Sequence, residues 1–172
     1  MKQRWALVIL GAWIMGSICM SIVATENFYT VDRLLAAPHP GLTASAQKLG
    51  QPVTRDLLRY LSSELNRLYF QMWNAAQVVL GAAAWWLVRD RRGAAAKGIL
   101  AMLAIVVLML AYLTPSIVTL GRELDFVPRD PAPPGMSRFW VLHAAYTSLE
   151  MLKLAGGLFV AGLIARDSNM IA

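Results

Sequence analysis

Apolar residues along the chain gather in four long blocks separated by more polar stretches. A helix needs roughly 20 apolar residues to cross a hydrocarbon core of about 30 Å, and each block is near that length or longer. None of the blocks alternates apolar and polar positions as a β-strand would. Because backbone groups in lipid must be bonded within a helix or a closed barrel, the pattern predicts four membrane-spanning helices, at residues 5–24, 68–88, 99–120 and 139–165.

A further helix is predicted in the long connection after the first block. Thr54 follows Pro52 and is a plausible N-cap, with Asp56 in the first turn, where the helix dipole favours an anion. The leucines that follow form one apolar stripe, at positions 57, 58, 61, 65 and 68. The spacing predicts an amphipathic helix over 54–67 that runs without a breaker into the second block. We expect it to lie on the membrane surface or to pack on the bundle.

Composition agrees with the block pattern. Of the 172 residues, 58% are hydrophobic and 15% are charged, and the mean hydropathy is +0.51. Ordinary soluble domains are about 45–50% apolar and about 25% charged, so a soluble enzyme and a disordered tail are both excluded. The predicted fold is an all-α integral membrane four-helix bundle, a single transmembrane domain over 1–172 with the amphipathic helix added in its first connection.

The distribution of Lys and Arg predicts orientation. Basic residues crowd the short link at 89–97 and the two ends of the chain, at Lys2, Arg4 and Arg166, whereas the two longer connections mix both signs. The positive-inside rule then places both termini in the cytoplasm. The net charge of +6 is explained by topology, and no nucleic-acid partner is predicted. The tryptophans lie mostly near the block ends, as an aromatic belt would: Trp5, Trp13, Trp85, Trp86 and Trp140.

The first block could be a signal peptide, because Lys2 and Arg4 form a basic start. Its length, and Ile22 at the −3 position of a cleavage after Ala24, favour an uncleaved helix. Cys19 is the only cysteine, so no internal disulfide is possible.

The fourth block contains the only charges predicted at membrane depth. His143, Tyr146, Glu150 and Lys153 are spaced three, four and three apart, so they share one helix face. Charges at this depth are costly and should face the bundle interior and pair; Glu150 and Lys153 can neutralise each other at i, i+3. One interpretation is an interhelical lock with Asn74 and Gln77 as partners. The other is a proton relay, an ion site or a polar ligand contact.

Two polar groups are expected on the outer side, Glu26 and Asn27 after the first block and Arg122, Glu123 and Asp125 after the third. They either bind an ion or a partner loop, or form a solvated, self-paired rim. Only His39 and His143 could be histidine ligands, and Cys pairs and nucleotide or hydrolase motifs are absent from the sequence. We therefore predict no catalysis, no metal and no cofactor of the chain's own. A bound lipid, or a pigment or haem shared with a partner, stays open.

Three short segments resemble a known family: Glu26-Asn27-Phe28, the run at 66–74, and Phe139-x3-His143-x2-Tyr146. Together they are similar to small bacterial four-helix membrane proteins of unknown function related to transmembrane protein 205. The resemblance implies a four-helix bundle in the bacterial inner membrane, spanning it several times, and no established chemistry.

The functional expectation is a non-catalytic accessory subunit that packs against a larger membrane complex, for example an energy-transducing one, and stabilises it. Its partners would be membrane lipids and other membrane subunits. The alternative is a small transporter or ligand-binding membrane protein that uses the polar face of the fourth helix.

Overall fold

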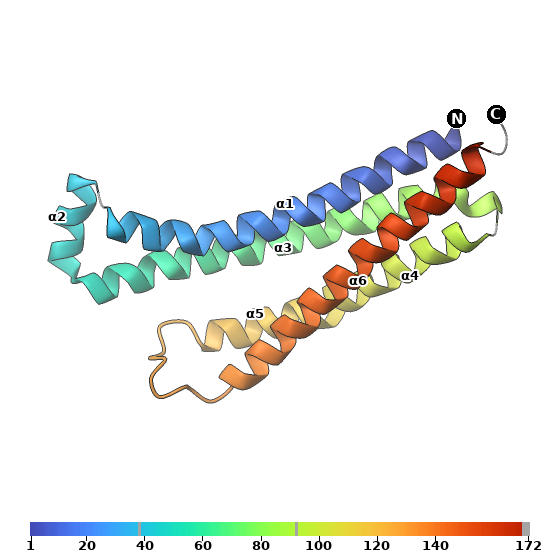
Figure 1. Ribbon diagram of the computed structural model, residues 1–172. Coiled ribbons are helices and arrows are strands. Elements are labelled where there is room, and N and C mark those ends of the chain that lie inside the picture. Colours follow the sequence, from blue (N-terminus) through green and yellow to red (C-terminus); the bar gives the residue numbers. More distant parts are fainter. Residues whose placement is uncertain (38, 92, 170–172) are drawn as a thin grey trace.

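The computed structural model describes residues 1–37, 39–91 and 93–169, and this part of the chain folds into helices with no strand (Figure 1). The elements in chain order are α1 (Lys2–Ala36), α2 (Pro40–Leu49), α3 (Gln51–Val88), η1 (Arg89–Arg91), α4 (Ala94–Leu108), η2 (Met109–Leu113), α5 (Thr114–Glu123) and α6 (Met136–Asn169). Arg92 of the predicted basic link and the last residues of the predicted domain, 170–172, lie outside the described residues.

Three helical segments are long and apolar enough to cross a membrane: Lys2–Ala36, Ala94–Glu123 and Met136–Arg166. The prediction of an all-helical protein is confirmed for the described residues, and three of the four predicted spans correspond to helices that could cross a membrane. The predicted second span lies within α3, which is not among the three. The physical reason is the presence of Gln71, Asn74 and Gln77, whose amides lower the hydropathy of this stretch.

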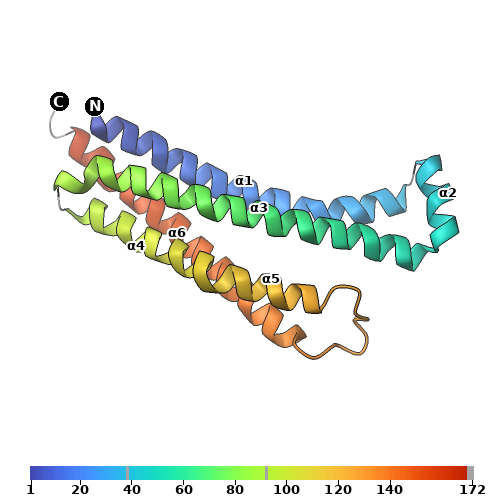
Figure 2. The same ribbon diagram turned by 180° about the vertical axis from the view of Figure 1, so that it is seen from behind.

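Four helical rods pack lengthwise: α1, α3, the continuous segment from α4 through α5, and α6. α1 contacts α3, α3 contacts α4, and α6 contacts both α4 and α1. Their shared core contains fully buried Leu10, Ile99, Val106 and Val160. The start of α1, the link between α3 and α4 and the end of α6 lie at one end of the molecule, and α2 lies at the other (Figures 1 and 2).

Helices α1 and α3 extend furthest beyond their predicted bounds. α1 continues to Ala36 instead of ending at Ala24, and the predicted amphipathic helix over 54–67 is the first part of α3. No Gly or Pro interrupts the chain from Ala24 to Ala37. The charged side chains of the extension find partners, since Asp32 pairs with Arg55 at 3.0 Å and with Arg59 at 3.2 Å. The amphipathic helix thus packs against α1 as a direct extension of α3, and it is not a separate helix.

Helix α2 was not predicted, although its start signals are in the sequence. Pro40 occupies the first turn, and Nδ1 of His39 accepts a hydrogen bond from the backbone N–H of Gly41 at 3.1 Å. Gly50 separates α2 from α3 with a φ of 86°, a conformation that favours glycine. The extensions of α1 and α3, together with α2, form a projection of residues 25–37 and 39–67 that we call the arm. It extends beyond the other rods (Figure 1).

The third rod contains one turn of π-helix, η2, between α4 and α5. Pro115 follows two residues after this turn and has no N–H to donate to the carbonyl of Ala111, so regular α-helical bonding is interrupted here. α5 continues to Glu123, three residues past the predicted end at 120. α6 begins at Met136 and extends beyond the predicted 139–165 at both ends.

Candidate functional site

Seven polar side chains meet in the bundle interior and form what we call the inner network: Trp13, Asn74, Gln77, Thr114, Tyr146, Glu150 and Lys153. They come from α1, α3, α5 and α6, so every rod contributes. Asn74 and Gln77 are fully buried, and Lys153 is 1% exposed. Buried polar groups in such a place must be hydrogen-bonded to be tolerated.

Gln77 lies at the centre of this network. Its Oε1 accepts a hydrogen bond from the indole N–H of Trp13 at 2.9 Å. The same oxygen accepts a second hydrogen bond from Nζ of Lys153. The amide nitrogen of Gln77 donates to Oδ1 of Asn74, one turn earlier on α3, at 3.2 Å. One side chain therefore joins α1, α3 and α6.

Asn74 extends the network to the third rod. Its amide nitrogen donates to Oγ1 of Thr114 at 2.8 Å, and its Oδ1 accepts from the hydroxyl of Tyr146 at 3.3 Å. Thr114 is the first residue of α5, directly after the π-helical turn. The irregular turn thus immediately precedes a polar contact between two helices. Single π-helical turns are frequent at functional sites.

The predicted pair of Glu150 and Lys153 is present. Nζ of Lys153 lies 2.8 Å from Oε1 and 2.8 Å from Oε2 of Glu150. The side chain of Glu150 is 13% exposed. Because the two charges are adjacent, the network as a whole is electrically neutral, and the arrangement suits an interhelical lock.

His143 is the one residue of the predicted polar face that has no hydrogen bond to this network among the described residues. Its ring packs against Phe139, with centroids 4.6 Å apart, and against Trp140 at 6.1 Å. Its Nδ1 is buried without a hydrogen-bond partner. Tyr146, which could have bonded Glu150, donates to Asn74 instead.

Two members of the network were not predicted. Trp13 was grouped with tryptophans that lie mostly near block ends, but its side chain is 1% exposed and belongs to the core. Its position in the middle of the first apolar block, away from either end, was the available signal. Thr114 precedes Pro115 and has no sequence feature that would separate it from an ordinary helix residue.

The outer polar residues form separate, internally paired groups. Glu26 pairs with Arg33 at 2.6 Å, and the amide of Asn27 donates to Oδ1 of Asn66 at 2.6 Å. No hydrogen bond or ion pair among the described residues joins Glu26 or Asn27 to Arg122 or to any other member of the second group.

The second group, which we call the outer ion cluster, consists of Glu64, Arg67, Arg122 and Asp125. Arg67 pairs with Glu64 at 2.5 Å and with Asp125 at 2.8 Å, and Arg122 pairs with Glu64 at 3.3 Å. Hydrogen bonds from Arg122 and then Arg67 hold the pKa of Glu64 below its usual value. Burial lowers the pKa of Arg67, but the carboxylates of Asp125 and Glu64 outweigh this and leave it raised.

Glu123 was grouped with these residues by sequence but does not join them. Its side chain is exposed at the end of α5, and the described residues provide no ion-pair partner for it. The outer residues therefore match a self-paired rim more closely than a site with unused ligands.

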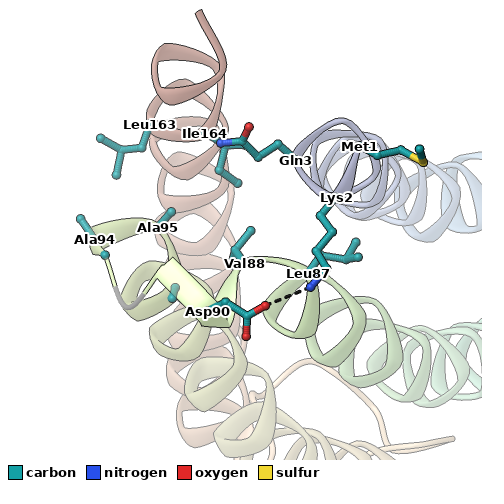
Figure 3. Close-up of a pocket in the computed structure, with 12 residues that line it drawn as sticks. Met1, Lys2, Gln3, Leu87, Val88, Asp90, Ala94, Ala95, Leu163 and Ile164 are labelled. Atoms are coloured by element: carbon teal, nitrogen blue, oxygen red, sulfur yellow. Dashed lines mark hydrogen bonds and ion pairs between the residues drawn. The ribbon is translucent and has the colours of Figure 1, made fainter. Parts of the chain in front are cut away.

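A cavity of about 460 Å³ lies at the end of the bundle where the basic residues gather (Figure 3). Its wall comes from the first residues of α1, from Asp90 of η1, from the start of α4 and from Leu163 and Ile164 of α6. Lys2 and Asp90 form an ion pair at 2.9 Å across its edge, and the hydrogen bond from Lys2 lowers the pKa of Asp90. Because the charges of Lys2 and Asp90 neutralise each other, this ion pair adds no net charge to the cavity wall.

No group of three or more His, Cys, Asp or Glu that could hold a metal ion occurs among the described residues. Comparison with known proteins gives no match to a protein family, to a curated protein or to a solved structure. The resemblance to proteins related to transmembrane protein 205 therefore stays a prediction.

Proposed function

We propose that this chain is a non-catalytic accessory subunit that packs against a larger membrane complex and stabilises it; an energy-transducing complex is one such partner. The observation that carries the proposal is the arm. Among the large apolar side chains that it exposes are Tyr29 at 59%, Val53 at 49% and Leu61 at 56%. Large exposed apolar surfaces mark sites of contact with proteins or membranes.

The few buried residues of the arm also support this proposal. Among the described residues, the buried side chains of the arm are Val31, Ala46, Thr54 and Ser62, of which two are polar and none is larger than valine. Packed helices need a further layer to bury an outward apolar face. The arm is therefore well suited to be completed by another subunit.

We further propose that α3 is a fourth membrane-spanning helix, so that the rods form a four-helix bundle with both termini in the bacterial cytoplasm. The start of α1 and the end of α6 lie at the same end (Figure 1), which requires an even number of crossings. Asn74 and Gln77 lower the hydropathy of α3 but face inward and are hydrogen-bonded, so lipid does not meet them. Lys2, Arg89, Lys97 and Arg166 belong to the shared end, as the positive-inside rule expects for the cytoplasmic side.

The inner network favours a structural role over transport. A transport path needs polar groups that exchange partners with water or a substrate, whereas Lys153 and Gln77 are buried and bonded to neighbouring helices. The alternative, a small transporter or ligand-binding protein, draws on the 13% exposure of Glu150 and on the unpartnered Nδ1 of His143. It predicts that Glu150→Gln abolishes an activity while the fold is retained.

The test is extraction of native membranes with a mild detergent, followed by native electrophoresis and mass spectrometry of the co-migrating proteins. We expect the chain in one large complex at fixed stoichiometry with its partners. Migration alone or as a homo-oligomer would overturn the accessory-subunit function. In the same experiment, Glu150→Gln should reduce the amount of complex or its heat resistance, since the lock would be weakened.

A further inference from the structure

One exposed apolar stripe runs along almost the whole length of α3. Its members are the exposed large apolar residues Val53, Leu57, Leu61, Leu68, Met72, Val79 and Trp86. Successive members are four or seven residues apart, so they lie on one side of the helix. Asn74 and Gln77, which face the bundle, occupy the opposite side. We call this surface the α3 stripe.

The α3 stripe is longer than a membrane is thick. From Val53 to Trp86 it covers about 50 Å at a rise of about 1.5 Å per residue, whereas the hydrocarbon core measures about 30 Å. Lipid tails can cover the part near Met72 and Val79. They cannot also cover Val53 and Leu57 in the arm, so an occupant of the whole stripe has to emerge from the bilayer alongside α3.

Gln71, the fourth residue of the predicted span 68–88, favours a protein neighbour at the start of the membrane part. Its side chain is exposed on the same side of α3 as Met72, and no described residue hydrogen-bonds its amide. Lipid tails offer no partner to an amide, whereas a neighbouring helix can both donate and accept.

An aromatic pair borders the arm end of the stripe. Tyr60, one residue before Leu61, contacts Phe126 with ring centroids 5.0 Å apart. Phe126 is 58% exposed and has a φ of 59°, a backbone conformation that is unfavourable for a bulky residue. Strained residues of this kind persist where they serve a contact or a site. Exposed aromatic side chains are also frequent anchors of protein interfaces.

Two charges of the arm, those of Arg55 and Arg59, point away from this surface. Arg55 and Arg59 lie two residues before and after Leu57, about 200° around the helix, and both pair with Asp32 of α1. Their charges are used to hold α1 and α3 together. An occupant of the stripe therefore meets a mainly apolar surface near Leu57 and passes the outer ion cluster at Glu64, whose charge is already paired with Arg67 and Arg122.

We propose that the α3 stripe and the Tyr60–Phe126 pair bind an apolar helix of another membrane subunit, which runs along α3 and leaves the bilayer beside the arm. This inference rests on the proposed function and identifies its contact surface.

The test uses single-cysteine variants in a Cys19→Ser background. Leu57→Cys and Leu61→Cys report on the stripe, and Gln47→Cys on α2, whose side chain is also exposed, is the matched control. The rate of reaction with a membrane-impermeant maleimide is measured in native membrane fragments open on both sides. It is measured again for the purified protein in vesicles of the same lipids. We expect the two stripe cysteines to react roughly tenfold more slowly in native membranes, since interface cores exclude water, and the control to react equally in both.

Each other outcome overturns the proposal in a recognisable way. Reaction of Leu57→Cys at the rate of the control in both preparations means that no subunit covers the stripe. Slow reaction in both preparations without cross-linking identifies lipid as the occupant. Efficient cross-linking of Leu57→Cys to the same position of a second copy identifies a homodimer. If the chain migrates in a large complex and Leu57→Cys still reacts equally, the accessory-subunit function stands and the stripe is not its contact surface.

Discussion

Lys153 of α6 donates a hydrogen bond to Oε1 of Gln77 on α3, and this contact links a buried cation to a neutral amide across two helices. On its own helix Lys153 meets Glu150 at 2.8 Å. The carboxylate therefore neutralises the charge, while the amide fixes the position of the ammonium group relative to α3. Trp13 donates to the same amide oxygen, so α1 is held by the same contact point.

Lys153→Met should destabilise the purified protein strongly. The substitution leaves Glu150 without its cation and Gln77 without one of its donors. Breaking a buried ion pair by removing one partner costs about 3–5 kcal/mol. The free energy of unfolding in detergent, measured by denaturant or thermal titration, gives the loss.

A double-mutant cycle distinguishes this cause from a packing defect. Because Glu150→Gln in the Lys153→Met background removes the uncompensated carboxylate, the double variant should lose less stability than the sum of the two single variants. Leu152→Met, at an exposed neighbouring position, is the control and should be nearly neutral. Additive losses in the cycle would show that the pair is not energetically coupled.

Gly16→Ala should also destabilise the bundle. A Cβ at this position would lie 2.1 Å from the Trp73 ring, so the indole or α1 must move. Overpacking of this kind costs about 1–3 kcal/mol. Gly11→Ala on the same helix is a matched control, since a Cβ there meets nothing within 4 Å. Thermal unfolding of both variants in one detergent measures the difference, and equal melting temperatures would contradict the close approach of α1 to Trp73.

The sequence predicted the helical class and the apolar cores of the helices because these follow from local hydropathy. It also predicted that Glu150 and Lys153 pair and that Asn74 and Gln77 face the same region, since these follow from helical spacing and from the cost of polar groups in lipid.

Long-range contacts account for what could not be predicted. Hydropathy alone places the end of α1 at Ala24, yet the helix continues to Ala36, where Asp32 pairs with Arg55 and Arg59 from far along the chain. Trp13 bonds Gln77, and Thr114 bonds Asn74, only because the packing brings them together. No spacing rule along a single helix contains that information.

The outer ion cluster predicts a pH dependence of stability. The pKa of Glu64 is lowered from 4.5 in the folded chain by Arg122 and Arg67, so the unfolded state binds the proton more readily. Stability from this group is therefore fully present above about pH 4.5 and is lost as the pH falls through the lower, folded pKa. The effect should not exceed about 1 kcal/mol, because solvent screens such pairs.

Glu64→Gln should remove this contribution. The difference in unfolding free energy between the unmodified chain and Glu64→Gln should be largest near neutral pH and shrink in acid. Glu123→Gln, which replaces an exposed carboxylate without an ion pair among the described residues, is the control for the loss of one carboxylate. A Glu64→Gln difference that stays constant from pH 7 to acid would contradict the role of the ion pairs.

Two substitutions of Phe126 can separate the energetic cost of its strained backbone from the contribution of its ring contact with Tyr60. With a φ of 59°, a non-glycine residue there carries a cost of about 1–2 kcal/mol. Phe126→Ala loses the ring contact with Tyr60 and keeps the strained backbone, whereas Phe126→Gly loses the same contact and relieves the strain. The glycine variant should therefore be about 1 kcal/mol more stable than the alanine variant in thermal unfolding of the isolated protein. At Val127, which has no positive φ, the order should reverse, because glycine only adds flexibility to the unfolded chain. If alanine is the more stable replacement at both positions, Phe126 is not strained, and its exposure beside Tyr60 no longer supports a contact role.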